Sequence, residues 1–139
     1  MIISEVMTHD VRIASPDDTL ETAARLMEEE DFGSLPVAEN DQLVGMLTDR
    51  DIAIRAVARG LVPRDTTVRE VMSAEIKYVY DDETVRDVAR VMGDLHIRRL
   101  PVVNRAKRLV GIVSLGDLAL TKPTSAGDAL QSIAGAPAS

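Results

Sequence analysis

Two pairs of side chains in the 139-residue sequence have the types and the spacing to bind a small hydroxylated molecule. Thr48 stands three residues before Asp51, and Ser114 stands three residues before Asp117. A carboxylate has two acceptor oxygens, which can take both vicinal hydroxyls of a ribose. If each pair lies where a strand ends and a helix begins, free backbone N–H groups there add an anion site. The alternative is structural: the hydroxyls cap helices and the aspartates favour the helix dipole.

Two arginines supply the cations that a phosphate group needs, but only in the second half of the sequence. Arg98 and Arg99 are adjacent, and a guanidinium fork matches phosphate oxygens. The matching stretch of the first half, Gly33-Ser34, carries no charge. We therefore expect unequal sites, with the one that contains Ser114 better suited to a phosphorylated ligand. The one that contains Thr48 has Arg50 and Arg55 nearby on its helix, and is either weaker or borrows an arginine from the other unit. A solvated arginine pair or a salt bridge in a dimer is the alternative.

These residues recur because the sequence repeats itself. Glu5-Val6-Met7-Thr8 returns 65 positions later as Glu70-Val71-Met72-Ser73. Leu35-Pro36-Val37 returns at the same offset as Leu100-Pro101-Val102, and beyond these strands the offset becomes 66. Chance does not keep so many matches in register, so the chain is a tandem of two similar units.

The repeat divides the chain into four parts. We assign the first unit to residues 1–60, a linker to 61–69, the second unit to 70–122 and a C-terminal tail to 123–139. The tail is rich in Ala, Ser, Gly and Pro, and we expect one short helix around residues 128–133 in an otherwise loosely ordered segment.

Each unit has the pattern of an α/β fold with the order β-α-β-β-α, and we expect two such units to pack with pseudo-twofold symmetry. In the first unit the expected elements are an extended segment at 11–14, a helix capped by Thr19, strands at 34–38 and 43–47, and a helix at 50–59 stopped by Gly60. The matching strands of the second unit are 99–103 and 109–113. The apolar helix stripe is Leu20, Ala23, Ala24 and Met27, repeated as Val85, Val88, Ala89 and Met92. Acidic residues 28–31 oppose the dipole of the first helix, which predicts fraying there.

This order of elements, met twice, resembles the CBS domain, and the pair resembles a Bateman module, the tandem CBS unit that binds adenosine nucleotides in many regulatory proteins. The resemblance covers about residues 1–120. The whole chain is similar to the small stand-alone CBS-pair proteins that have no effector domain. The motifs that carry it are Val6-Met7-Thr8, Leu35-Pro36-Val37, residues 43–51 and residues 109–117.

The resemblance implies a set of ligand-binding residues. The hydroxyl and aspartate of the family motif contact ribose and phosphate, and basic residues at two places contact the phosphates. Adenine lies in an apolar slot beside the first strand and the residues around the Leu-Pro-Val strand. Carried over to this sequence, the set is Thr48, Asp51, Ser34, Ile13, Ala14, Tyr78, Val79, Arg98, Arg99, Pro101, Ser114 and Asp117. A tyrosine in a strand more often packs in a core or an interface, and that alternative holds for Tyr78.

The resemblance also implies a regulatory, signal-sensing function. AMP, ADP or ATP would bind in clefts between the two units and relay its presence by a change of conformation or assembly. The residues do not separate these ligands from S-adenosylmethionine or NAD. We expect a homodimer, an unidentified protein partner and no required cofactor. The alternative is an adaptor CBS pair with no physiological nucleotide. CBS pairs also occur inside IMP dehydrogenases, which need a barrel and a catalytic cysteine. This sequence has neither, so we expect that the chain is not an enzyme.

Composition limits the other classes of function. The chain has no cysteine, which excludes disulfides and thiolate zinc sites, and His9 and His96 have no second ligand at metal-binding spacing. A net charge of −7 disfavours nucleic acid and anionic membranes as partners. Aromatic residues make up 2%, too few for a base-stacking platform. We expect a cytoplasmic protein, because the N-terminus lacks the pattern of a signal peptide and no apolar run reaches membrane length.

Overall fold

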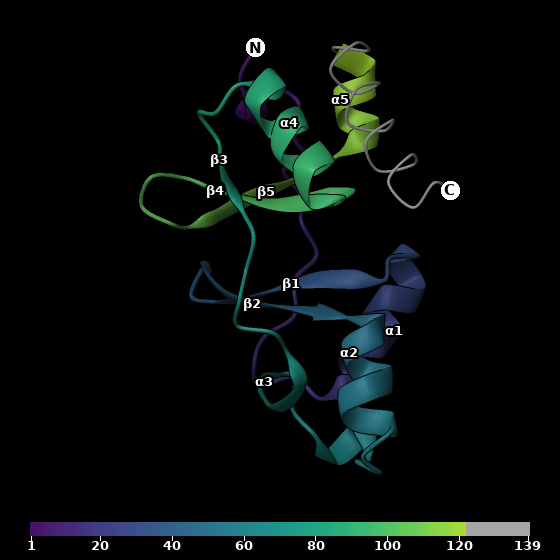
Figure 1. Cartoon of the computed structure of the whole chain (residues 1–139). Helices are drawn as coiled ribbons and strands as arrows, with labels where there is room; N and C mark the ends of the chain where they lie inside the picture. Colours follow the sequence, from purple (N-terminus) through teal and green to yellow (C-terminus); the bar gives the residue numbers. More distant parts are fainter. Residues whose placement is uncertain (122–139) are drawn as a thin grey trace, which may run out of the picture. The chain divides into compact units, whose positions relative to one another are not determined.

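The computed structural model describes residues 1–121, and its two compact units do not follow the order of the sequence repeats (Figure 1). The central unit is Arg12–Ile76. The terminal unit combines Met1–Val11 with the described chain from Lys77 onward. The first eleven residues therefore pack with the second repeat. The tail assigned to 123–139, with its expected helix, lies outside the described residues.

The central unit contains the expected helix, hairpin and helix. Its elements are α1 (Leu20–Glu30), β1 (Ser34–Glu39), β2 (Gln42–Thr48), α2 (Asp49–Asp51), the π-helix η2 (Ile52–Val57), the 3-10 helix η3 (Pro63–Asp65) and α3 (Val68–Val71). Thr19 caps α1 as predicted, because its side chain accepts a hydrogen bond from the Thr22 N–H at 3.1 Å. The extended segment at 11–14 is reduced to one parallel bridge between Ala14 and Val37. Gly60, with φ of 73°, follows the second helix.

The terminal unit shows the complete β-α-β-β-α order. Its elements are the 3-10 helix η1 (Ile3–Glu5), β3 (Val79–Tyr80), α4 (Val85–Leu95), β4 (Arg99–Val103), β5 (Leu109–Ser114) and α5 (Leu115–Thr121). The sheet order is β3-β4-β5, parallel between β3 and β4 and antiparallel between β4 and β5. Val79 pairs with Val102 at the position where Ala14 pairs with Val37 in the central unit. The two units therefore repeat the same arrangement of strands.

Aliphatic side chains fill both cores, as the scarcity of aromatic residues predicts. Leu20, Leu35 and Leu47 are fully buried in the central unit, and Met92 and Leu100 are fully buried in the terminal unit. Leu20 and Met92 come from the helix faces that the periodicity predicts, whereas β1 and β4 are buried at four consecutive residues each.

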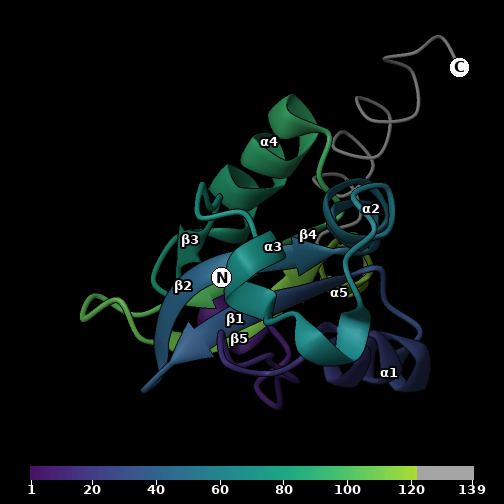
Figure 2. The same cartoon turned by 90° about the horizontal axis from the view of Figure 1, so that it is seen from below.

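The predicted burial of one residue of the apolar stripe, Ala24, is wrong. Ala89 of α4 is buried, whereas the matching Ala24 of α1 is exposed. The neighbours of the two helices differ: α5 packs against α4 (Figure 1), whereas η3 contacts α1 (Figure 2). Ala24 therefore lines an open groove.

The repeated Val-Met-Thr/Ser segments explain why the packing units differ from the sequence repeats. Thr8 exchanges backbone hydrogen bonds of 2.8 and 3.0 Å with Ile112, and Ser73 does the same with Met46 at 2.8 and 2.9 Å. Each segment thus pairs with a strand of the other repeat. The methionine of each segment lies on a strand glycine. An added Cβ would come 2.5 Å from Met7 Sδ at Gly111 and 2.7 Å from Met72 Sδ at Gly45.

The single inserted residue lies in the second hairpin. The β1–β2 turn consists of Asn40 and Asp41, both with positive φ (53° and 66°), as a tight two-residue hairpin turn requires. The β4–β5 connection is longer, and Asn104 Oδ1 organises it by accepting hydrogen bonds from the N–H groups of Ala106 and Arg108, each at 3.0 Å. The change of offset from 65 to 66 is therefore a change of loop.

The acidic end of α1 is helical through Glu30, and fraying of that end remains a prediction. Asp31 adopts a left-handed conformation (φ 56°), and Phe32 N–H donates to the Met27 carbonyl at 3.1 Å, which ends the helix as a Schellman-type cap. Arg12 lies 3.4 Å from a Glu30 carboxylate oxygen and offsets part of the negative charge.

Candidate functional site

Thr48 and Asp51 lie where β2 ends and α2 begins, as the sequence predicts. Asp51 Oδ2 accepts a hydrogen bond from the Thr48 N–H at 3.0 Å, and Thr48 Oγ1 accepts one from the Asp51 N–H at 3.0 Å. This reciprocal capping box fixes both side chains. The other carboxylate oxygen of Asp51 lies 4.0 Å from Arg55 Nε.

Ser114 and Asp117 repeat this geometry at the junction of β5 and α5. Asp117 Oδ2 accepts from the Ser114 N–H at 2.9 Å, and Ser114 Oγ accepts from the Asp117 N–H at 3.1 Å. The structural alternative therefore describes a real contact in both units. It holds each hydroxyl and carboxylate in one place and half-buried, which is also what a preorganised binding site needs.

The residue pairs across each hairpin place the predicted polar groups side by side. Arg99 pairs directly with Ser114, and the Arg98 carbonyl accepts a 3.1 Å hydrogen bond from the Leu115 N–H. Residues directly opposite in an antiparallel pair project from the same face of the sheet. In the central unit Ser34 pairs with Thr48 in the same way.

Each of the two groups takes its name from its capping hydroxyl residue. The Ser114 site consists of Arg98, Arg99, Ser114 and Asp117, all in the terminal unit. The Thr48 site consists of Gly33, Ser34, Thr48 and Asp51, all in the central unit.

The residues predicted to contact adenine divide between the two units. Ala14 is fully buried, and its N–H donates to the Pro36 carbonyl at 3.0 Å, while the neighbouring Ile13 is 40% exposed. In the terminal unit Val79 is buried in the sheet and Tyr78 is half-buried. The two tyrosine rings, Tyr78 and Tyr80, meet edge to face with centroids 5.8 Å apart.

Pro101 is buried in β4, opposite Ile112 of β5. Its structural place is therefore within the hairpin that also carries Arg99 and Ser114. Its predicted contact with a ligand remains a prediction.

Charge distinguishes the Thr48 site from the Ser114 site. Where the terminal unit has Arg98, the central unit has Gly33, and the Asp49 carboxylate covers it: a Cβ on Gly33 would lie 2.7 Å from Asp49 Oδ2. The residue that matches Asp49 in the terminal unit is Leu115, an uncharged side chain. A carboxylate in one unit thus stands beside the position at which the other carries an arginine.

Arg55 lies beside the Thr48 site, with its Nε 4.0 Å from Asp51 Oδ1, but two backbone carbonyls hold its other end. Its Nη1 donates to the carbonyls of Val71 and Met72 at 3.3 and 3.2 Å. This guanidinium therefore helps to close the end of α3, and it is not a simple substitute for the arginines of the Ser114 site.

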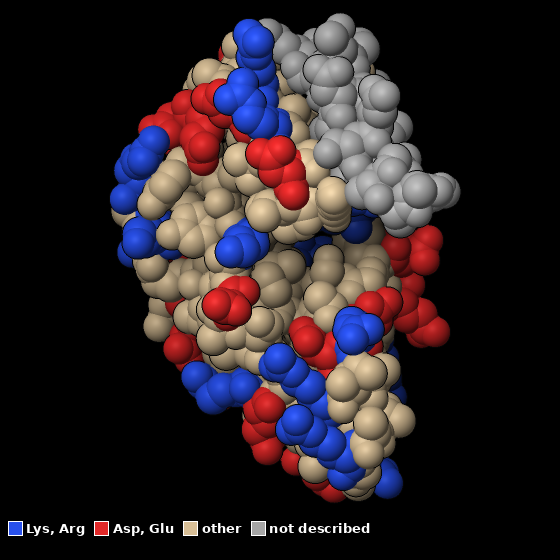
Figure 3. Space-filling view, viewed as in Figure 1, with Lys and Arg blue, Asp and Glu red and all other residues tan. Residues whose placement is uncertain are grey.

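Sequence reasoning missed two surface clusters that join distant residues. Arg105 donates to both carboxylate oxygens of Asp82, at 2.8 and 2.7 Å, and its guanidinium carbon lies 4.1 Å from the centre of the Tyr80 ring. The hydrogen bond from Arg105 lowers the pKa of Asp82 below its ordinary value of 3.8. In the central unit Arg69 lies 3.4 Å from Asp17 and 3.3 Å from Glu39. The pairing of β3 with β4 brings Asp82 near Arg105, and backbone hydrogen bonds from α3 to Pro16 and Asp18 bring Arg69 near Asp17. Figure 3 shows basic and acidic side chains interspersed over the face that it displays.

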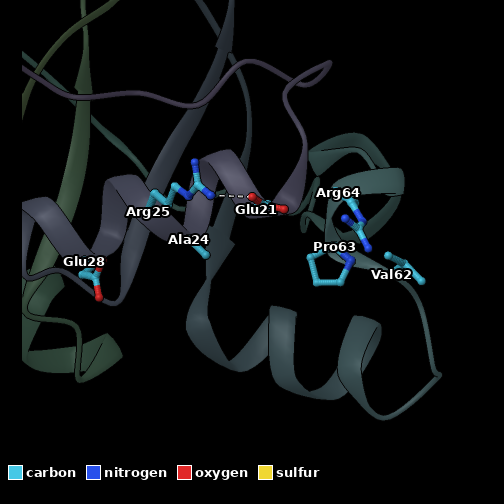
Figure 4. Close-up of a pocket in the computed structure, with 7 residues that line it drawn as sticks. All are labelled: Glu21, Ala24, Arg25, Glu28, Val62, Pro63 and Arg64. Carbon is cyan, nitrogen blue, oxygen red and sulfur yellow. Dashed lines mark hydrogen bonds and ion pairs between the residues drawn. The ribbon is translucent and has the colours of Figure 1, made fainter.

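An open pocket of about 510 Å³ lies beside α1 in the central unit (Figure 4). Its lining residues are Glu21, Ala24, Arg25, Glu28, Val62, Pro63 and Arg64. Glu21 and Arg25 form an ion pair of 2.6 Å across one turn of the helix. None of the predicted ligand-binding residues lines this pocket, and no pattern in the sequence indicated it, because the apolar stripe placed Ala24 in the core.

Residues 1–121 contain neither a metal-binding cluster nor a membrane-spanning helix. This part of the chain holds no group of three or more His, Cys, Asp or Glu side chains arranged to bind a metal ion. None of its helices has the length and apolar character needed to cross a membrane.

Comparison with known proteins places both repeats in one family. The model of the CBS domain matches residues 3–57 and again residues 68–121. The CBS domain-containing protein YhcV of Bacillus subtilis is 44% identical over 135 residues, which are 94% of this chain and 94% of that protein. An inosine-5'-monophosphate dehydrogenase of Methanocaldococcus jannaschii is 33% identical over 115 residues, but these are only 22% of the enzyme.

Solved structures show the same fold. The crystal structure of Hypoxic Response Protein I with two coordinated zinc ions has a TM-score of 0.78 and 37% identity, covering 88% of this chain and 100% of that one. In the sequence comparison, hypoxic response protein 1 of Mycobacterium tuberculosis is 39% identical over 123 residues. The CBS domain pair of protein MJ0100, in complex with 5-methylthioadenosine and S-adenosylmethionine, has a TM-score of 0.71 and 27% identity, covering 86% of this chain and 98% of that one. The chain belongs to the CBS domain family, as a tandem pair of CBS domains.

Proposed function

We propose that this chain is a regulatory module that binds an adenosine nucleotide, such as AMP, ADP or ATP, at the Ser114 site. The observation that carries the proposal is the position of the arginines: Arg99 pairs directly with Ser114, and Arg98 is bonded through its carbonyl to the first residue of α5. Phosphate oxygens suit this pair of guanidinium groups. The Asp117 carboxylate, held by its cap, would accept the ribose hydroxyls.

The ligands of a related CBS pair support an adenosine compound. The MJ0100 pair was crystallised with 5-methylthioadenosine and S-adenosylmethionine, which share the adenosine group. In this chain the backbone around Val79 would meet the adenine, and Tyr78 would lie beside it, as expected from the sequence.

The proposed output is a shift between conformations or assemblies. A ligand shifts such an equilibrium only as far as it binds one state more tightly than the other. We propose that the chain forms a homodimer and that nucleotide binding alters what a protein partner recognises. The relation to enzymes is indirect, because the match to the dehydrogenase covers only a fifth of that protein.

A second function has one observation in its favour. The reciprocal caps account for Thr48, Asp51, Ser114 and Asp117 without any ligand. An adaptor CBS pair that binds a partner but no nucleotide would need these residues for stability alone.

Isothermal titration of the full chain with AMP, ADP and ATP separates the two functions. Replacing both arginines (Arg98→Ala with Arg99→Ala) should weaken AMP binding about 30-fold, or about 2 kcal/mol, because charged hydrogen bonds to phosphate are lost. The matched control is Arg86→Ala with Arg90→Ala, which removes two exposed arginines of α4 in the same unit. Equal loss in both double variants, or no binding by the wild-type chain, contradicts the proposal and favours the adaptor.

A further inference from the structure

The Thr48 site keeps the ribose-binding groups of the Ser114 site but reverses the charge beside them. Both sites have the same reciprocal cap, with all four hydrogen bonds between 2.9 and 3.1 Å. Both also have the same backbone link, from Asp49 N–H to the Gly33 carbonyl at 2.8 Å and from Leu115 N–H to the Arg98 carbonyl at 3.1 Å. The positions of side chains around the two caps can therefore be compared one by one.

The Asp49 carboxylate lies beside Gly33, at the place where the side chain of a larger residue would begin. Its Oδ1 accepts a hydrogen bond from the Arg50 N–H at 2.8 Å, and its Oδ2 lies 2.7 Å from the place of a Cβ on Gly33. The carboxylate therefore occupies the space from which Arg98 extends in the terminal unit. None of the ion pairs within residues 1–121 includes Asp49, and Arg50, its direct neighbour in the helix, does not face it.

We infer that Asp49 is a specificity-determining residue, which makes the Thr48 site select adenosine compounds that carry no phosphate. This inference rests on the proposed function, since it assumes that the cap binds a ribose. A phosphate placed as in the Ser114 site would meet a carboxylate, and like charges at such a distance repel. A neutral or positively charged 5′ substituent meets no such repulsion. The favoured class is therefore adenosine itself or a sulfonium compound such as S-adenosylmethionine.

The arrangement also explains why Gly33 and Asp49 occur together. A side chain at residue 33 would displace the Asp49 carboxylate, because its Cβ would come within 2.7 Å of Oδ2 and 3.1 Å of Cγ. Gly33 and Asp49 therefore depend on each other. A larger residue at position 33 alone gives a clash, and a smaller residue at position 49 alone leaves an unfilled space.

The test uses the full chain with the Ser114 site disabled by Arg98→Ala, Arg99→Ala and Asp117→Asn. Calorimetry with adenosine, AMP and S-adenosylmethionine then reports on the Thr48 site. We expect adenosine and S-adenosylmethionine to bind more tightly than AMP. Adding Asp49→Asn, or Asp49→Leu after the residue found in the terminal unit, should raise the affinity for AMP relative to adenosine about tenfold. Asp65→Asn removes an exposed carboxylate elsewhere in the same unit and should leave the ratio unchanged.

The outcomes separate this inference from the function on which it rests. AMP binding as tightly as adenosine in the disabled chain, or a ratio that does not respond to either Asp49 variant, overturns the role of Asp49. No binding of any compound by the disabled chain also overturns it, while arginine-dependent AMP binding by the wild-type chain would still support the Ser114 site. Absence of binding in both chains rejects both proposals.

Discussion

Two hydrogen bonds join Thr48 to Asp51, and two matching ones join Ser114 to Asp117. Each matching pair differs in length by only 0.1 Å. The residues around them differ completely in charge. The terminal unit brings Arg98 and Arg99 to its cap, and the central unit brings Gly33, Ser34 and the Asp49 carboxylate. The comparison separates what the fold requires, which is the cap and its backbone, from the side chains beside the cap, which we propose determine the ligand.

The largest loss of stability is expected from substitutions at Gly111 and Gly45, where the two units are most alike. An alanine at Gly111 or at Gly45 would force its Cβ against a methionine sulfur, and also within 2.9 Å of a backbone carbonyl oxygen, Thr8 O or Ser73 O. Overpacking of this kind costs about 2 kcal/mol. We expect both variants to lose that much free energy of unfolding in urea titrations. A loss in one variant only would show that the exchanged segments are not equivalent.

Transplanting the arginine sharpens the difference between the sites. The double variant Gly33→Arg with Asp49→Leu gives the central unit the residues of the terminal unit. It should gain affinity for AMP by about tenfold, or about 1.4 kcal/mol, measured by calorimetry in the chain whose Ser114 site is disabled. Gly33→Arg alone is the control, because Asp49 then remains to pair with the new arginine. An equal gain in the single variant contradicts a separate role for Asp49.

The caps should contribute equally to stability in the two units. Thr48→Ala and Ser114→Ala each remove one acceptor of a helix N–H, and loss of such a cap costs about 1 kcal/mol. Chemical denaturation of both variants checks this equality. A clearly smaller loss for Ser114 would indicate that its geometry serves the ligand at the expense of the helix.

The smallest effect concerns a contact that only the terminal unit has, the bidentate pair of Asp82 and Arg105. Arg105 lowers the pKa of Asp82 below 3.8, so the pair stabilises the folded chain above that pH and loses its contribution as pH falls through the lower folded-state pKa. Asp82→Asn should therefore lower Tm slightly at pH 7 and have no effect well below pH 3.8. A difference in Tm that grows on acidification contradicts this sign.

The repeat was sufficient to predict most of the fold. The offset of 65 identified the two helices, the two hairpins and the Thr19 cap, because local periodicity and capping residues determine these elements. The exchange of Met7 and Met72 between the repeats was not predictable, because it depends on which strand each segment reaches. The exposure of Ala24 depends likewise on a neighbour, η3, that no pattern within α1 encodes.

The candidate sites were predictable in their residues and less so in their contacts. Spacing placed Thr48 and Asp51 at a strand–helix junction, but whether their hydrogen bonds serve a cap, a ligand or both is a question of geometry. Asp49 carried no signal in the sequence, because its effect depends on the bare backbone of Gly33 beside it. A charge comparison of matching positions in the two repeats is the step that identifies such a residue.

A crystal structure of the full chain grown with AMP tests the central claim most directly, namely that the two caps are alike and the Ser114 site alone takes a phosphate. The account predicts the AMP phosphate within hydrogen-bond distance of the Arg98 or Arg99 guanidinium and the ribose hydroxyls on the Asp117 carboxylate. A phosphate bound at the Thr48 site beside Asp49, or crystals without nucleotide at saturating AMP, would contradict it.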